Sequence, residues 1–294
     1  MARQADRVGR IGIWSGIWST ALKEGSYRAE LDDAAAELDA LGYGAVWLGS
    51  SAGVELADRL VAATPRITVA TGILSIWEHE AADVAAQRAE LERRHPGRFL
   101  LGLGVSHGSL AKDYSRPYSA MVDFLDALDS APDPVPADGR VLAALGPKML
   151  ALSRDRAAGA HPYLVTPEHT AQAREILGEG ALLAPELKVV LDTDLDKART
   201  TARNYLAYYL KLPNYAGSLL RLGFTEDDLA DGGSDRLLDA VFALGDADTI
   251  AARVTDFLSA GADHVAVQAV TDDPQHIIPL PQWRRLAEVL PLGG

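Results

Sequence analysis

Histidines are the side chains in this sequence best suited to move a proton near neutral pH. Seven are present, and none pair at the helical spacing of two metal ligands: His79, His95, His107, His161, His169, His264 and His276. The spacing therefore predicts no metal site. His107 and His79 follow short apolar runs, where a proton donor would stand beside a ligand, so they are the candidate catalytic residues. For each, an ordinary surface histidine is the alternative.

A second candidate site is the segment Gly146-Pro147-Lys148-Met149. Proline at the first position of a helix leaves the following backbone amides free, and such helix starts bind anions. The ammonium group of Lys148 adds positive charge there. The segment predicts a phosphate or carboxylate site, with a plain strand-to-helix turn and a solvated lysine as the alternative.

Four glycines fall within or at the ends of apolar runs, where glycine normally weakens a strand: Gly72, Gly102, Gly104 and Gly146. A glycine there marks a bulge or a close approach of backbone to a ligand, and four together favour a ligand over crowded barrel geometry. The Gly102-Leu103-Gly104 run is not a dinucleotide fingerprint, because the next glycine, Gly108, is one residue too far along.

Other nucleophiles are poorly represented. The sequence has no cysteine, which excludes disulfides, thiolate catalysis and zinc–thiolate sites and fits a reducing cytoplasm. Ser50-Ser51 lacks the glycine-flanked elbow of a serine hydrolase.

Charge and hydropathy exclude further classes. The net charge of −13 argues against a nucleic-acid partner, which rewards clustered Lys and Arg. No signal peptide is visible near the start, and no apolar run is long enough to span a membrane. We expect a soluble cytoplasmic protein with a small-molecule substrate.

The candidate site residues lie in a sequence that alternates between short apolar runs and helical patterns. The predicted strands cover residues 11–14, 45–48, 67–76, 99–105, 141–145, 160–165, 187–191 and 263–270. The predicted helices cover residues 28–41, 55–64, 81–94, 118–129 and 147–157, a helix that Thr166 and Pro167 begin, and then 195–210, 235–244 and 249–260. Near-continuous apolar strands are typical of parallel strands that are buried on both faces.

Eight strands with intervening helices predict an α/β protein of the (β/α)8 TIM-barrel type. Residues 1–294 read as one domain, with a helical insertion at about 194–245 between strands 7 and 8. In such barrels the active site lies at the carboxyl ends of the strands, which would bring the candidate residues together.

Several of these segments resemble the bacterial luciferase-like superfamily. Pro96-Gly97-Arg98-Phe99 running into Gly104 is similar to its strand-4 signature, and Thr71-Gly72-Ile73 stands where the family has a non-proline cis peptide. The segments 143–149 and 158–160 match its strand-5 and strand-6 pattern, and the likeness extends from Ile11 to Leu290. Residues 161–170 resemble the actinobacterial branch of coenzyme F420-dependent oxidoreductases.

The resemblance implies hydride transfer between a deazaflavin (F420) and an unidentified small organic substrate. It implies that the cofactor is held by three groups of residues, which are Gly72 and Ile73, then Gly104, Val105 and Ser106, then Gly146, Pro147, Lys148, Met149, Ala158 and Gly159. His107 stands near the position of an acidic residue in better-studied members, whereas Ser50 and Ser51 replace the histidine or aspartate that many carry after strand 2.

The predicted substrate pocket is completed by side chains at other strand ends, which are Trp14, Trp47, Trp77, Ser50 and His161. Plain core packing is the alternative for the tryptophans. Two other functions remain open: a luciferase-like monooxygenase that uses FMN, and a cofactor-binding partner subunit without turnover. The resemblance also implies a homodimer.

Overall fold

The strands form one parallel sheet of 11 segments that curls into a barrel. The computed structural model describes residues 4–19, 28–111, 114–272 and 278–292, so His276 lies outside the described residues. The strands are β1 (Ile11–Ser15), β2 (Ala45–Leu48), β3 (Thr68–Thr71), β4 (Leu74–Ser75), β5 (Phe99–Gly104), β6 (Arg140–Leu142), β7 (Gly159–Ala160), β8 (Leu182–Leu183), β9 (Glu186–Leu191), β10 (Phe242–Gly245) and β11 (Val265–Ala269).

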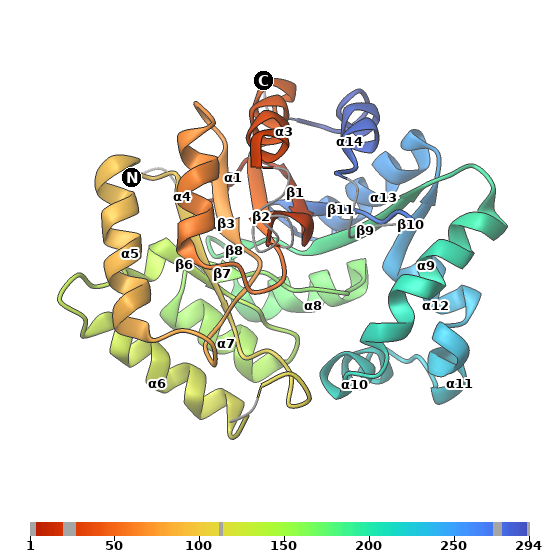
Figure 1. Ribbon diagram of the computed structural model, residues 1–294. Helices are drawn as coiled ribbons and strands as arrows, with labels where there is room; N and C mark the ends of the chain where they lie inside the picture. The colour runs from red at the N-terminus through yellow and green to blue at the C-terminus, as the bar shows by residue number, and fades with distance from the viewer. Residues whose placement is uncertain (1–3, 20–27, 112–113, 273–277, 293–294) are drawn as a thin grey trace.

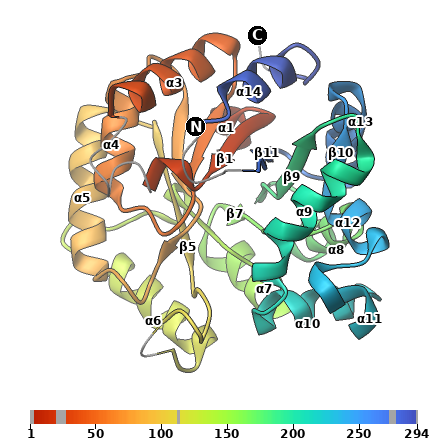
Figure 2. The same ribbon diagram turned by 45° about the vertical axis from the view of Figure 1, so that its right-hand side comes forward.

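Helices surround these strands, and α6, α7 and α10 lie at the same lower end in both views (Figures 1 and 2). The helices are α1 (Gln4–Val8), α3 (Arg28–Leu41), α4 (Val54–Ala62), α5 (Ala81–Arg94), α6 (Pro117–Asp129), α7 (Pro147–Arg156), α8 (Pro167–Leu177), α9 (Leu195–Tyr209), α10 (Pro213–Arg221), α11 (Glu226–Leu229), α12 (Asp235–Val241), α13 (Ala247–Ser259) and α14 (Leu280–Ala287), with short 3-10 turns at Ala137–Gly139 and Ala230–Gly232.

The eight strand positions of a (β/α)8 barrel are all present, and two of them are interrupted. The third is split into β3 and β4 by a cis peptide between Gly72 and Ile73, where the resemblance places one. The seventh is split into β8 and β9 by Ala184 and Pro185, whose backbone groups still bond to the sixth and eighth positions. The ladder therefore passes from β7 through β8 and β9 to β11 and β1, which confirms the barrel.

Alternate residues of each strand face opposite sides, which divides the core in two. One cluster of side chains packs between strands and helices and includes Ile13, Val46 and Leu101. A second cluster fills the space that the strands enclose and is built from the intervening residues, among them Trp14, Trp47, Leu100 and Val141. Glu186 and Lys188 continue this inward-facing row along β9 and are fully buried.

The insertion between strands 7 and 8 is present, but its last part differs from the prediction. The helix expected to reach residue 244 ends at Val241, and β10 follows and pairs in parallel with β9. Phe242 and Leu244 are buried in the insertion's own apolar cluster. Periodicity misses this strand because four apolar residues after a helix fit either pattern.

Two predicted strands are shorter than expected. β6 ends at Leu142 and β7 at Ala160, so residues 143–145 and 161–165 become loops at the carboxyl end of the barrel. The apolar side chains there line a cavity or pack on the insertion instead of extending the sheet. The predicted cap of α8 is confirmed, because the Thr166 side chain accepts a hydrogen bond from the amide of His169 and Pro167 occupies the first turn.

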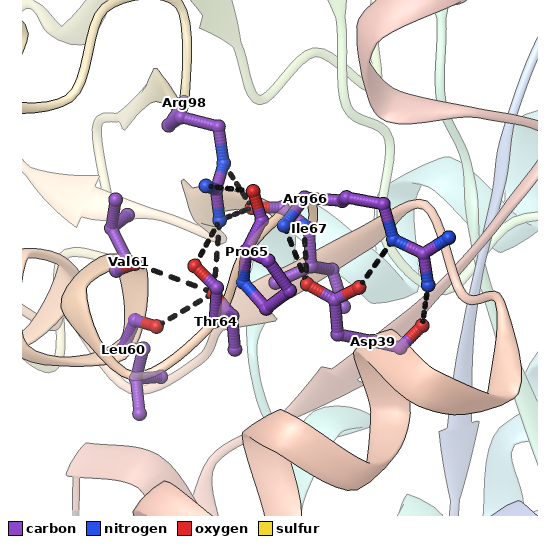
Figure 3. A network of polar contacts seen from close by, with 8 residues as sticks. All are labelled: Asp39, Leu60, Val61, Thr64, Pro65, Arg66, Ile67 and Arg98. Carbon is purple, nitrogen blue, oxygen red and sulfur yellow. Dashed lines mark hydrogen bonds and ion pairs between the residues drawn. The ribbon is translucent and has the colours of Figure 1, made fainter.

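At the opposite end of the barrel, a polar network ties α3 and α4 to the starts of β3 and β5 (Figure 3). Asp39 is 3% exposed and accepts hydrogen bonds from the amides of Arg66 and Ile67 and from the Arg66 side chain. Burial alone would raise the pKa of Asp39, but these bonds outweigh it and lower the pKa. Arg98 donates to the carbonyls of Thr64, Pro65 and Ile67 and to the Thr64 hydroxyl.

This network predicts a large cost for replacing Arg98. Arg98→Lys keeps the charge but loses the planar fork that reaches all these acceptors, so we expect the free energy of unfolding to fall by about 1–3 kcal/mol. The matched control is Arg93→Lys, whose side chain is 62% exposed and for which we expect a change within about 0.5 kcal/mol. Urea denaturation measures both, and equal small losses would contradict the prediction.

Among the described residues, no helix combines the length and the apolar composition that a membrane span requires.

Candidate functional site

A cavity of about 900 Å³ opens at the carboxyl ends of the strands. We call it the mouth cavity. Its wall comes from the ends of β1 and β2, the cis peptide after β3, the loops after β5, β6 and β7, and the end of α9 with α10. This volume lies in the upper part of the roughly 300–1,000 Å³ range of pockets for small molecules and cofactors.

The structure brings most of the predicted site residues to this cavity. Those that line it are Trp14, Ser50, Gly72, Ile73, Val105, Ser106, His107, Gly146, Pro147, Lys148, Met149 and His161. They are separated by up to 147 positions in sequence, from 14 to 161, and the barrel gathers them because parallel strands all end at the same rim.

Four of the predicted residues do not line this cavity: three support it from outside, and the fourth lines a neighbouring one. Trp47 is fully buried beneath His161, and Trp77 donates from its indole nitrogen to the carbonyl of Val105. The space beside Gly104 is filled by the Ile73 side chain, 2.6 Å from where a Cβ would stand. His79 lines a neighbouring cavity of about 210 Å³ together with Ser51 and Glu78.

Ala158 and Gly159 lie at the start of β7, whereas the mouth cavity is at the strand ends. The amide of Ala158 bonds to the carbonyl of Arg140, and a Cβ on Gly159 would stand 1.9 Å from the carbonyl oxygen of Leu182. The structure therefore does not bring these two residues to the cavity. The close approach of β8 explains why residue 159 is glycine.

The four glycines of the sequence pattern have different reasons to be glycine. A Cβ on Gly102 would stand 1.9 Å from the carbonyl oxygen of Thr71, and one on Gly72 would stand 2.7 Å from the Trp14 indole nitrogen. Gly104 is crowded by Ile73. Only at Gly146 is there nothing within 4 Å, so only this glycine leaves open space beside the cavity. Protein packing, rather than a ligand, accounts for the other three.

His161 forms the floor of the mouth cavity with Trp14 and Gly72. Its ring stacks on Trp47 at 4.1 Å, and its Nδ1 lies 2.6 Å from the carbonyl oxygen of Ala184. Because a carbonyl only accepts, Nδ1 carries the proton, and Nε2 is an acceptor with no partner. Burial lowers the pKa of His161 to about 3, so the ring is neutral at physiological pH.

His107 lies on the loop after β5 and faces the insertion. Its ring is 4.8 Å from that of Tyr215, and Asn214 Nδ2 is 3.4 Å from its Nδ1. Burial lowers the pKa of His107 below its usual value, so the neutral imidazole predominates at neutral pH. Ser106, just before it, has a φ of 52°, which turns the chain into the cavity.

The start of α7 makes one end of the cavity positive. Gly146 caps the helix and Pro147 opens it, so the next amides have no partner within the helix. Lys148 and Arg221, which come from α7 and α10, both line the same cavity. Free amides with two cationic side chains suit an anionic group of a ligand.

A buried polar network lies behind the cavity wall, and sequence reasoning missed it. Lys188 Nζ is 2.6 Å from Glu186 Oε2 and 3.6 Å from the centre of the Tyr163 ring. The Tyr163 hydroxyl lies 3.1 Å from that of Tyr205 and 3.0 Å from that of Tyr209. Burial raises the pKa of Glu186 and lowers that of Lys188, in each case against the attraction of the partner.

This network joins the insertion to the barrel, because Tyr205 and Tyr209 are on α9 whereas Tyr163, Glu186 and Lys188 belong to the barrel positions. Gln268 of β11 completes it by accepting from the Tyr163 hydroxyl and donating to Tyr205. The available sequence signal was a Glu and a Lys at alternate positions of a strand that is otherwise apolar. Among the described residues, no group of three or more His, Asp or Glu side chains is arranged to hold a metal ion.

A family model described as luciferase-like monooxygenase matches residues 11–264. The chain therefore belongs to the luciferase-like monooxygenase family, a class of oxidoreductase. No curated protein matches the sequence closely enough to count as a relative.

Solved structures share this architecture over nearly their whole length. An F420-dependent secondary alcohol dehydrogenase, in complex with an F420–acetone adduct, is 14% identical, with a TM-score of 0.72 and coverage of 96% of this chain and 98% of that one. The coenzyme F420-dependent tetrahydromethanopterin reductase from Methanopyrus kandleri is 15% identical, with a TM-score of 0.70 and coverage of 96% and 99%.

A third similar structure is the oxygenating constituent of 3,6-diketocamphane monooxygenase from Pseudomonas putida, in complex with FMN. It is 13% identical, with a TM-score of 0.66 and coverage of 96% of this chain and 97% of that one. These TM-scores show a common fold, which is shared by enzymes described with F420 and by one described with FMN.

The buried pair predicts a strongly non-additive mutant cycle. Lys188→Met or Glu186→Leu alone leaves one charge buried without its partner and should cost about 3–5 kcal/mol of unfolding free energy. The double variant removes both charges and should cost clearly less than the sum. Guanidinium denaturation of the three variants measures the coupling, and additive losses would contradict it.

Proposed function

We propose that the chain binds the deazaflavin F420 in the mouth cavity and transfers a hydride between it and a small organic substrate. The observation that carries this proposal is a cavity at the strand ends that has a positive helix start at one end and the Trp14 and His161 side chains in its lining. A phosphate-bearing tail suits the helix start, and a flat ring suits the aromatic lining. The likeness of residues 161–170 to the F420 branch supports the deazaflavin.

The described residues fit such a cofactor. Lys148, with the free amides at the start of α7, would hold the phosphate, and Arg221 faces the same space. Trp14, Gly72 and Ile73 would support the ring, because the Trp14 indole donates to the carbonyl of Gly72 at 2.9 Å and fixes that backbone. Val105 and Ser106 would contact the ring or its chain. The deazaflavin supplies the hydride chemistry, and the protein supplies position and exclusion of water.

His107 is the proposed proton donor to the substrate. Its ring lines the cavity and is held between Tyr215 and Asn214. A neighbouring imidazole can protonate an oxygen that becomes negative as hydride arrives. His79 is less well placed, because its ring lines the neighbouring cavity. By the resemblance to the luciferase-like superfamily we also propose a homodimer. The absence of cysteine supports the proposal that it works in the cytoplasm.

The first test is a fluorescence titration of the purified protein with F420 and, in parallel, with FMN. We expect F420 to bind more tightly than FMN. We expect Lys148→Gln to weaken F420 binding about tenfold, which corresponds to about 1.4 kcal/mol, because the variant lacks the ammonium group that would pair with the phosphate. Lys211→Gln is the matched control, since Lys211 is exposed and does not line the cavity.

Tighter binding of reduced FMN, with oxygen uptake in the presence of a substrate, would favour the monooxygenase instead. Failure of both cofactors to bind would overturn the proposal.

The second test concerns His107. We expect His107→Ala to lower kcat for reduction about 100-fold with little change in cofactor binding, since general acid catalysis contributes about 10²–10⁴. Because the pKa of His107 is lowered, the wild-type rate should rise as the pH falls below neutrality and the imidazolium becomes populated, whereas the variant should not respond.

His79→Ala should change kcat by less than about threefold, since general acid catalysis requires a group within hydrogen-bond reach of the substrate. Unchanged turnover of His107→Ala would remove His107 from the mechanism. If the wild-type protein binds cofactor but turns over nothing in a broad substrate panel, the partner-subunit function is favoured.

A further inference from the structure

The outer rim of the mouth cavity exposes large apolar side chains to solvent. In the described part of the chain, five large hydrophobic residues are markedly exposed, and three of them line this cavity: Leu110, Tyr118 and Tyr208, at 54%, 44% and 50%. They come from the loop after β5, from α6 and from α9. Exposed apolar side chains that gather at one cavity indicate a ligand that covers them.

Two groups of aromatic side chains also line this cavity, and we call them its two aromatic walls. One wall is Tyr114, whose ring is 5.6 Å from that of Trp77. The other wall is Tyr209 with Tyr215, whose rings meet edge to face at 5.6 Å. Aromatic rings that line a cavity favour a flat guest that can stack on them or meet them edge-on.

Polar groups at the rim are few and uncharged. Asn214 Nδ2 reaches the carbonyl of Ser106, the His107 ring and the Tyr114 hydroxyl only at 3.4–3.5 Å, so its donors are weakly used. Of the described residues that line the cavity, the charged ones are Glu78, Lys148 and Arg221. The two cations are those proposed above for the cofactor phosphate, which leaves the rim with an amide donor and no assigned cation.

We propose that the rim is the substrate subsite and that it takes a flat, uncharged, mostly apolar molecule with a hydrogen-bond acceptor, such as an aryl ketone. The aromatic walls contact its ring, Leu110 covers its edge, and Asn214 donates to its oxygen beside His107. That such a molecule is also reduced rests on the proposed function. That it binds here is argued only from the residues at the rim of the cavity.

The test is isothermal titration of the full chain with 2-acetonaphthone, with decanal as a flexible apolar comparator and glucose 6-phosphate as a charged one. The absence of cysteine excludes thiol adducts with these carbonyl compounds. We expect the ketone to bind at least tenfold more tightly than decanal and the sugar phosphate not to compete. Equal binding of the two carbonyl compounds would overturn the proposal.

Tyr118→Ser and Tyr208→Ser should each weaken ketone binding about three- to tenfold, a loss typical of truncating one aromatic contact. Leu195→Ser is the matched control, because Leu195 is 47% exposed on α9 but does not line the cavity. Unchanged affinity in both tyrosine variants, or an equal loss in the control, would overturn the subsite.

A titration of the ketone in the presence of saturating cofactor separates the two proposals. Retained ketone binding supports a subsite beside the cofactor, and complete displacement overturns it. If no cofactor binds but the ketone does, with the expected loss in the tyrosine variants, the proposed function fails while the subsite stands.

Discussion

The structure depends on the two-residue alternation of the barrel strands, which sends every second side chain into a space that no helix can reach. At the amino-terminal part of the barrel this space holds small and apolar side chains such as Ala45, Ala266 and Leu182. Toward the carboxyl end it holds Trp47, His161, Glu186 and Lys188. Trp47 stacks on His161 and donates to His264, and Lys188 pairs with Glu186. The floor of the mouth cavity is the upper surface of this filling, so packing inside the barrel fixes what a ligand meets.

The buried polar groups also decide how the insertion sits. Removing Lys188 and Glu186 from water is costly, and their attraction offsets that cost only when the surrounding polar atoms are satisfied. Tyr205 and Tyr209 of α9 join the Tyr163 hydroxyl, and Lys188 lies over the rings of Tyr163 and Tyr209. Oε1 of Glu186, in contrast, is buried without a hydrogen-bond partner. Helix α9 ends at Tyr209 and leads to Asn214 and Tyr215, which line the cavity. The way the insertion packs on the barrel therefore also sets the shape of the outer part of the cavity.

Prediction from the sequence succeeded where a local pattern has one physical solution. Thr166 before Pro167 has only one useful role, as a helix cap, and the apolar runs ending at Ser15, Leu48 and Gly104 form strands as expected. It failed where a short apolar segment suits two structures: residues 242–245 continue a helical pattern but pair with β9, since the exposed edge of that strand needs a partner. The prediction that the strand glycines mark a ligand did not take account of crowding by Thr71, Trp14 and Ile73, because the sequence does not show which distant residues lie beside each glycine.

The sequence by itself determined the parallel barrel, the order of its strands, and the rim at which His107, Gly146 and Lys148 meet, because the alternation of apolar runs and helices allows few other topologies. Only the tertiary structure decided that Trp47, Trp77 and Gly104 support the cavity rather than line it, and that Ala158 and Gly159 lie at the start of β7. It alone placed Tyr114, Asn214 and Tyr215 beside His107. Such contacts join residues about 100 positions apart, and no periodicity within one segment encodes the face that a distant helix will present.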